Sequence, residues 1–196
     1  RRPEAALRDD TALCFPESPT TPCLRVIDLP AAVRACRARG ARVVVDSTFA
    51  SPICYRPLEE GADFAIHSAT KYLGGHSDVL AGALVTRDDS PTWQEIRRTR
   101  HDEGAVIGPV EAFLLGRGIR TLFVRVEKQG RTALSLATRL AGRGVTVCYP
   151  GLPSHPQHEL AARQMRGGFG GMLSIRVADP LAVVSKLRLW VPATSL

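Results

Sequence analysis

Residues 42–46 form the run RVVVD, in which three β-branched valines stand together with no polar residue between them. Such a run is typical of a strand that is covered on both faces, as in the parallel sheets of α/β proteins. A helix over residues 29–39 is predicted before it, because Asp28 resembles a helix start and Gly40 a helix stop. With the apolar run at residues 12–17, the N-terminal part of the chain is predicted to be a strand, a helix and a strand.

The same alternation continues along the chain. Residues 63–67 (DFAIH) and 79–86 (VLAGALVT) are predicted strands, and residues 57–60, closed by a glycine, fit a short helix. Strands that alternate with helical connections favour an α/β layer with a mainly parallel sheet.

The character of the sequence changes after Pro109. Apolar residues from Val110 to Leu140 recur at helical spacing, which predicts one long helix or a bent pair. The remaining chain is predicted to be a strand, helix, strand and helix, at residues 145–149, 156–165, 172–177 and 180–189. We place a boundary near residue 125, so that residues 1–125 are part of an α/β domain and residues 126–196 part of a smaller α+β domain.

Composition limits the partners that we expect. The chain has 26 basic and 19 acidic residues, a net charge of +7, but the arginines are scattered and only 6% of the residues are aromatic. A nucleic-acid groove usually needs a continuous basic stripe with stacking aromatics, so we expect no nucleic-acid partner. The positive field favours anions such as phosphates or amino-acid carboxylates.

Membrane and secretion signals are weak as well. No apolar run approaches the roughly 20 residues that a spanning helix needs. The first residues, RRPEAALRDD, lack the apolar stretch of a signal peptide. We therefore expect a cytoplasmic protein without membrane contact.

Metal sites are not indicated. The five cysteines form no C-x-x-C pair, and their odd number suits reduced thiols better than disulfides. His155 and His158 form an H-x-x-H pattern, but Cys148 is the only other soft ligand nearby. We expect a loop or a surface helix start there, and no metal.

Two strand ends hold reactive side chains, and ligands of open α/β sheets gather at such ends. Asp46 closes a run that should be buried, which is costly for a carboxylate unless a positive group faces it. The simpler alternative is an aspartate that caps a turn through its own backbone.

The second strand end is HSATKYLGG, in which Ser68, Thr70 and Lys71 follow one another closely. Two hydroxyls can surround a phosphate while the adjacent amine remains free to react. Only three of the 26 basic residues are lysines, and only an amine can form an imine with an aldehyde. An ordinary polar loop after a strand is the alternative.

The stretch VVVDSTFASPICYRPLEEGADFAIHSATKYLGGHSDVLAG resembles the signature of the pyridoxal-phosphate enzymes of cysteine and methionine metabolism. This trans-sulfuration group includes cystathionine γ-synthase and cystathionine γ-lyase. The resemblance covers almost the whole chain, because four further stretches are similar to the same family in the same order: PESPTTPCLRVIDL, GIRTLFVRVE, YPGLPSHPQHELAARQM and GGMLSIRV.

The resemblance implies a fold, a cofactor and a class of reaction. The fold is the large domain of pyridoxal-phosphate-dependent transferases (fold type I, aspartate aminotransferase-like), with a mainly parallel sheet and a smaller α+β C-terminal domain. The cofactor is pyridoxal 5'-phosphate, and members are typically homo-oligomers, dimers or tetramers. The reaction is elimination or replacement at the β or γ carbon of a sulfur amino acid or an activated homoserine.

The resemblance also implies roles for five residues of this chain. Lys71 would hold the cofactor through an imine and later shuttle protons, and Asp46 would pair with the protonated pyridine nitrogen. Both are therefore candidate catalytic residues. Ser68 and Thr70 would hydrogen-bond the phosphate, and Thr48 would pack against the ring.

Some positions depart from the family pattern. Thr21 stands where the family usually has an asparagine near the ring hydroxyl, so we count it among the cofactor-binding candidates. Ser195 matches the start of a turn on the substrate side and is a candidate substrate-binding residue. Thr194 stands where several relatives have a glutamate, which leaves the choice between lyase and synthase open.

Relative to the family, a glycine-rich phosphate loop and the aromatic that stacks on the cofactor would precede Arg1. The chain also stops before the arginine that grips the substrate carboxylate. Two alternatives to an active enzyme therefore stay open. One is a truncated, catalytically incompetent copy that acts as an interaction partner, and the other is a basic surface-binding module.

Overall fold

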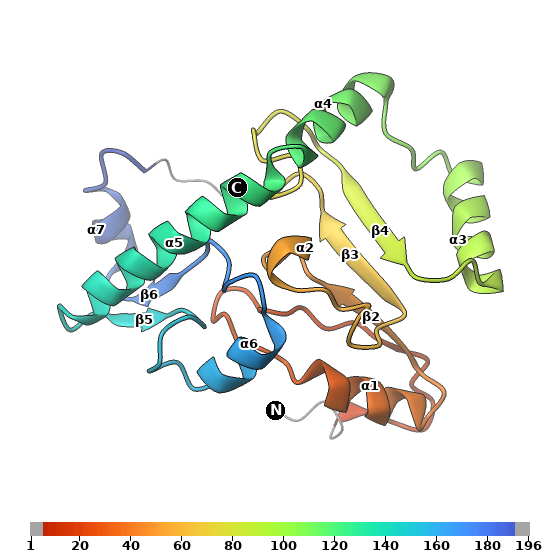
Figure 1. Ribbon diagram of the computed structural model, residues 1–196, viewed down its shortest axis with the longest axis horizontal. Coiled ribbons are helices and arrows are strands. Elements are labelled where there is room, and N and C mark those ends of the chain that lie inside the picture. The colour runs from red at the N-terminus through yellow and green to blue at the C-terminus, as the bar shows by residue number, and fades with distance from the viewer. Residues whose placement is uncertain (1–5, 191–196) are drawn as a thin grey trace.

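The computed structural model describes residues 6–190 and contains two sheets joined by a long helix (Figure 1). The larger sheet has four strands in the order β1-β2-β3-β4. The first three strands are parallel and β4 is antiparallel to β3. The strands are β1 (Leu13–Cys14), β2 (Arg42–Asp46), β3 (Phe64–Ser68) and β4 (Gly82–Thr86).

The mainly parallel sheet of the prediction is therefore present, with one exception. The chain returns from β3 to β4 without a crossover helix, and only antiparallel neighbours can be joined in this way. The turn between β3 and β4 contains Lys71.

Helix α1 (Leu29–Arg37) begins where the sequence predicts it. The side chain of Asp28 accepts a hydrogen bond from the N–H of Ala31 at 3.0 Å and so caps the first turn. Leu29, Val33 and Cys36 form the buried face that packs on the sheet.

The short helix predicted at residues 57–60 is wrong. These residues form turns, because the N–H groups of Glu59, Glu60 and Gly61 each bond the carbonyl three residues earlier. The short helix of this region is α2 (Ser51–Cys54), immediately after β2.

Helix α3 (Pro91–Asp102) has no counterpart among the predicted elements. It has no buried residue, so its sequence lacks the apolar periodicity on which the other helices were predicted. Its start nevertheless has local signals, because Ser90 Oγ accepts a hydrogen bond from the N–H of Trp93 at 3.2 Å and a proline follows the cap.

The apolar repeat after Pro109 forms a bent pair, α4 (Pro109–Ile119) and α5 (Leu122–Ala141), as one of the two predicted forms requires. Helix α5 runs from the larger sheet to the smaller one (Figure 1). The smaller sheet is an antiparallel pair, and short helices precede and follow its second strand. These elements are β5 (Thr146–Cys148), α6 (His158–Gln164), β6 (Ser174–Arg176) and α7 (Pro180–Val184).

Helix α5 contributes to two apolar cores. Leu122 and Val126 at its start belong to the core beneath the larger sheet, whereas Ala133 and Ala137 pack with Tyr149 beside the smaller sheet. The predicted domain boundary near residue 125 falls inside this helix and stays a prediction.

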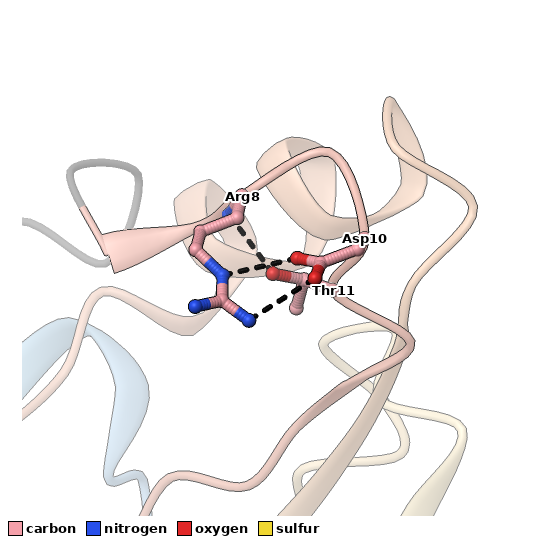
Figure 2. A network of polar contacts seen from close by, with 3 residues as sticks. All are labelled: Arg8, Asp10 and Thr11. Atoms are coloured by element: carbon pink, nitrogen blue, oxygen red, sulfur yellow. Dashed lines mark hydrogen bonds and ion pairs between the residues drawn. The ribbon is translucent and has the colours of Figure 1, made fainter.

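The segment before β1 is held by polar contacts at the surface. Arg8 donates two hydrogen bonds to the carboxylate of Asp10, and its N–H bonds Thr11 Oγ1 at 2.9 Å (Figure 2). All three residues are solvent-accessible, so these contacts add little stability. Within residues 6–190, no helix is both long and apolar enough to cross a bilayer.

Candidate functional site

The carboxyl ends of β2 and β3 bring two predicted site residues to one face of the sheet. Asp46 pairs with Ile66 in the parallel ladder, and Ser68 lies two residues farther along β3. Since side chains alternate between faces, Asp46, Ile66 and Ser68 point to the same side, whereas Val45 and His67 point to the other. Asp46, Ile66 and Ser68 are half-buried, whereas Val45 and His67 are buried.

Hydrogen bonds connect these residues through Thr48. The N–H of Thr48 donates to Asp46 Oδ1 at 2.9 Å, and Thr48 Oγ1 accepts from the N–H of Ser68 at 2.8 Å. The simpler interpretation of Asp46, a turn cap, therefore describes one of its oxygens. Oδ2 has no hydrogen-bond partner within residues 6–190, and no cation pairs with the carboxylate there.

Lys71 lies in the turn that follows β3. Its N–H donates to the carbonyl of Ser68 at 3.1 Å, and its own carbonyl accepts from the N–H of Gly75 at 2.7 Å. Its side chain is half-buried and lines a cavity of about 710 Å³. In the part of the chain that the structure describes, its amine has no hydrogen-bond or ion-pair partner.

Helix α5 forms the opposite wall of this cavity. Arg125, Lys128 and Gln129 line it together with Lys71, and its described lining contains no aspartate or glutamate. A cavity with three cations and no carboxylate favours anionic ligands. The sequence analysis predicted this preference only for the surface as a whole.

The hydroxyls of Thr70 and Thr21 already have partners within the chain. Thr70 Oγ1 accepts from the N–H of Ala81 at 3.0 Å and donates to its carbonyl at 3.3 Å. Thr21 Oγ1 donates to Glu17 Oε1 at 2.7 Å. The cofactor contacts of both threonines stay predictions, and for Thr70 the hydroxyl would have to turn away from the carbonyl. Ser195 lies outside the described residues.

Sequence reasoning missed Glu17. Its carboxylate also accepts from the N–H of Thr21 at 3.0 Å, and its backbone forms a parallel bridge with Asp46. Glu17 therefore ties the loop of Thr21 to the strand end. Nothing in its sequence position signals this role.

His67, on the buried face of β3, was likewise not predicted to matter. Burial lowers the pKa of its imidazole, against the charge of Asp46 and the backbone of Ser47, which raise it. The ring is therefore neutral near pH 7 and does not compensate the charge of Asp46. His67 Nδ1 and Ser47 Oγ are buried and have no partner among the described residues.

The two histidines of the H-x-x-H pattern have separate partners. His158 begins α6, two residues after the predicted helix start at Pro156, and its Nδ1 lies 2.8 Å from the carbonyl of Pro150. His155 is buried, unlike the surface position that was predicted, and its Nδ1 accepts from the N–H of Gln157 at 3.2 Å. No group of three potential metal ligands occurs within residues 6–190.

Comparisons with known proteins identify the family to which the chain is similar. A family model described as "Cys/Met metabolism PLP-dependent enzyme" matches residues 2–196. The chain is 48% identical over 175 residues to cystathionine gamma-synthase of Mycobacterium tuberculosis. These residues make up 88% of this chain and 45% of the relative. It is 43% identical over 182 residues to cystathionine beta-lyase of Lactococcus lactis, with 92% and 47% covered.

Solved structures are similar over nearly the whole chain. The crystal structure of metB from Corynebacterium glutamicum matches with a TM-score of 0.93 and 40% identity, covering 99% of this chain and 51% of that one. Apo CalE6, a methionine gamma lyase from Micromonospora echinospora, has a TM-score of 0.93 and 42% identity, with 98% and 54% covered. The chain thus spans about half the length of these relatives.

Proposed function

The chain belongs to the family of pyridoxal-phosphate-dependent enzymes of cysteine and methionine metabolism, and we propose that it provides the lysine and the aspartate of such an enzyme's active site. The proposed reaction is elimination or replacement at the β or γ carbon of a sulfur amino acid or an activated homoserine. The observation that supports it is the placement of Asp46 and Ser68 on one face, with Lys71 in the next turn.

Pyridoxal 5'-phosphate is the cofactor of this family, and the residues present suit it. The half-buried Asp46 has one carboxylate oxygen without a hydrogen-bond partner and no ion-pair partner among the described residues, so this oxygen can accept a hydrogen bond from a protonated ring nitrogen. The described lining of the cavity beside Lys71 is cationic, which suits a phosphorylated ligand, and it includes Thr70 but not Asp46, Thr48 or Ser68.

The proposed roles follow from this arrangement. When bound, pyridoxal phosphate supplies an electron sink for a carbanion on the substrate. Asp46 would keep the ring nitrogen protonated, because its charge favours a proton on a neighbouring base. The Nζ atom of Lys71 would first hold the cofactor covalently and later carry protons between substrate carbons.

Five further residues complete the proposed site. Ser68 would donate its hydroxyl to the phosphate, and Thr70 would do so after leaving the Ala81 carbonyl. Thr48 would pack against the ring while it holds the Ser68 backbone. Thr21 would lie near the ring hydroxyl, and Ser195 would contact the substrate.

Exposed apolar side chains support a homo-oligomer, a dimer or tetramer. Val110 and Phe113 on α4, and Phe123 and Val124 on α5, are exposed although they are large and apolar. Such a group of side chains is typical of a surface that another chain or segment covers. We propose no nucleic-acid or membrane partner and a cytoplasmic location.

The test is the formation of a covalent adduct at Lys71. The chain is incubated with pyridoxal phosphate, its visible absorbance is recorded, and borohydride is used to fix the adduct. The unaltered chain and the Lys186→Ala variant should gain absorbance, whereas Lys71→Ala should not. Lys186 is the matched control because it is an exposed lysine outside the cavity lining.

Equal adduct in Lys71→Ala would contradict the proposal. Adduct at Lys71 without product from cystathionine or an activated homoserine would favour the truncated, catalytically incompetent copy. No adduct in any variant would favour a basic module without catalysis.

A further inference from the structure

The guanidinium of Arg125, near the start of α5, is bound by uncharged oxygens. Nη1 donates to the carbonyl of Tyr72 at 2.9 Å, and Nη2 donates to the carbonyl of Gly118 at 2.9 Å. Nε donates to Thr121 Oγ1, also at 2.9 Å. Within residues 6–190 no carboxylate pairs with Arg125. Its guanidinium instead donates to two main-chain carbonyls and one hydroxyl.

The turn that contains Lys71 lies against Arg125 without room for a side chain. A Cβ atom on Gly75, where φ is +74°, would overlap Arg125 Nη1. A Cβ atom on Gly118 of α4 would overlap the carbonyl of Gly74. Glycine at both positions therefore allows the turn to pack directly on the α4–α5 junction.

The residue after Lys71 is held at both ends. The carbonyl of Tyr72 accepts from Arg125, and its buried hydroxyl accepts from the N–H of Gly171 at 3.1 Å. Lys71 itself is bonded to Ser68 on one side and to Gly75 on the other. The backbone of Tyr72 directly follows Lys71. Among the described residues, Arg125 has the only side chain from another part of the fold that bonds this backbone.

We propose that Arg125 is a positioning residue that fixes the turn from Lys71 to Gly75 and so directs the amine of Lys71 into the cavity. The proposal rests on the proposed function of Lys71. Small displacements of a reacting group lower reaction rates strongly. A rigid backbone on both sides of the lysine therefore keeps its amine in the position that favours reaction. A lysine could not replace Arg125 fully, because only the planar guanidinium presents several N–H donors in fixed directions.

The experiment measures how fast each lysine reacts with pyridoxal phosphate. The full chain is mixed with the aldehyde, samples are quenched with borohydride at set times, and the adduct on Lys71 and on Lys186 is quantified by peptide mass spectrometry. In Arg125→Met, labelling of Lys71 should slow by about tenfold or more, the equivalent of one hydrogen bond from a charged donor. Labelling of the exposed Lys186 should not change, so it serves as the internal reference for the reagent, and an unaltered circular dichroism spectrum of the variant excludes a general loss of structure.

Two further variants complete the test. Arg131 lies on the same helix and pairs with Glu127 at the surface. In Arg131→Met, Lys71 should be labelled at the unaltered rate. Arg125→Lys keeps the charge and should give an intermediate rate. Hydrogen exchange of the peptide over residues 69–76 should be faster in Arg125→Met than in Arg131→Met.

The outcomes are distinct. If the unaltered chain forms no adduct at Lys71, the proposed function fails. If it does, and folded Arg125→Met labels Lys71 at the same rate, Arg125 has no positioning role. If Arg125→Met does not fold, Arg125→Lys decides, and either an unaltered rate or a loss of folding in that variant would overturn the proposal.

Discussion

The turn after β3 and the arm formed by α3 and α4 lie close together in the chain but are held in opposite ways. Tyr72 and Leu73 of the turn are buried, and the turn is bonded by Arg125 of α5. Helix α3 has no buried residue, and Gly118 is the only buried residue of α4. The turn is therefore fixed by tertiary contacts. The arm has fewer: Trp93 of α3 lies 6.3 Å from Phe64 between ring centroids, and Arg125 bonds the carbonyl of Gly118 at the end of α4, while local signals such as the Ser90 cap support the rest.

This difference shows where partners are needed. Apolar residues of the arm, among them Val110 and Phe113, remain exposed in the chain by itself. The turn, in contrast, needs nothing outside the described residues to hold its backbone in place. The backbone of Lys71, the proposed reactive lysine, is thus held by contacts within the described residues, while the arm is suited to contact with another chain or segment.

The largest expected effect comes from removing the carboxylate of Asp46 at the end of β2. Asp46→Ala should still form the adduct at Lys71 but lose about 10²–10³-fold in turnover, because the ring nitrogen loses the group that keeps it protonated. Turnover is measured as product from cystathionine or an activated homoserine. Asp88→Ala, an exposed carboxylate before the arm, is the matched control and should keep full activity.

A stability measurement compares the two regions directly. Leu73→Ala should lower the free energy of unfolding by about 3 kcal/mol, because it removes buried methyl groups and leaves a cavity. Phe113→Ala removes a larger side chain from the exposed arm and should change the same quantity by no more than about 0.5 kcal/mol. Denaturant titration of both variants gives the two values. Equal losses would mean that the arm packs within the chain as tightly as the turn does.

The same contrast explains which elements the sequence reveals. The strand RVVVD and helix α5 were predicted because burial imposes an apolar pattern. Helix α4 was predicted from the same pattern, although its Val110 and Phe113 are exposed. Helix α3 escaped because an exposed helix has no such pattern, although Ser90 and Pro91 marked its start. The helix predicted at residues 57–60 failed because a turn-forming segment with short-range hydrogen bonds resembles a capped helix end in sequence.

The candidate site shows a similar limit. Asp46, Ser68 and Lys71 follow predicted strands, so their meeting at one edge can be inferred from the order of elements. Arg125 could not be found in this way, because it is one of many arginines and its partner carbonyl belongs to Tyr72, 53 residues away in the sequence. Any residue presents a carbonyl, so the sequence contains no sign of such a contact.

The smallest expected effect is a pH dependence from His67 beneath the strand end. Burial holds the folded-state pKa of His67 below its unfolded value of about 6.5, with Asp46 and the Ser47 backbone opposing the shift. Below about pH 6.5 the unfolded chain therefore binds more protons than the folded chain. Stability is complete above that pH and falls as the pH decreases toward the folded-state pKa, by at most about 1.4 kcal/mol per pH unit.

Unfolding free energies at pH 7.5, 6.5 and 5.5 measure this slope. His155 adds a fall of the same sign, since burial and the charge of His158 lower its pKa too. The share of His67 is therefore the difference in slope between the unaltered chain and His67→Gln, which should be shallower. An unchanged slope in His67→Gln would contradict the role of the buried histidine in acid sensitivity.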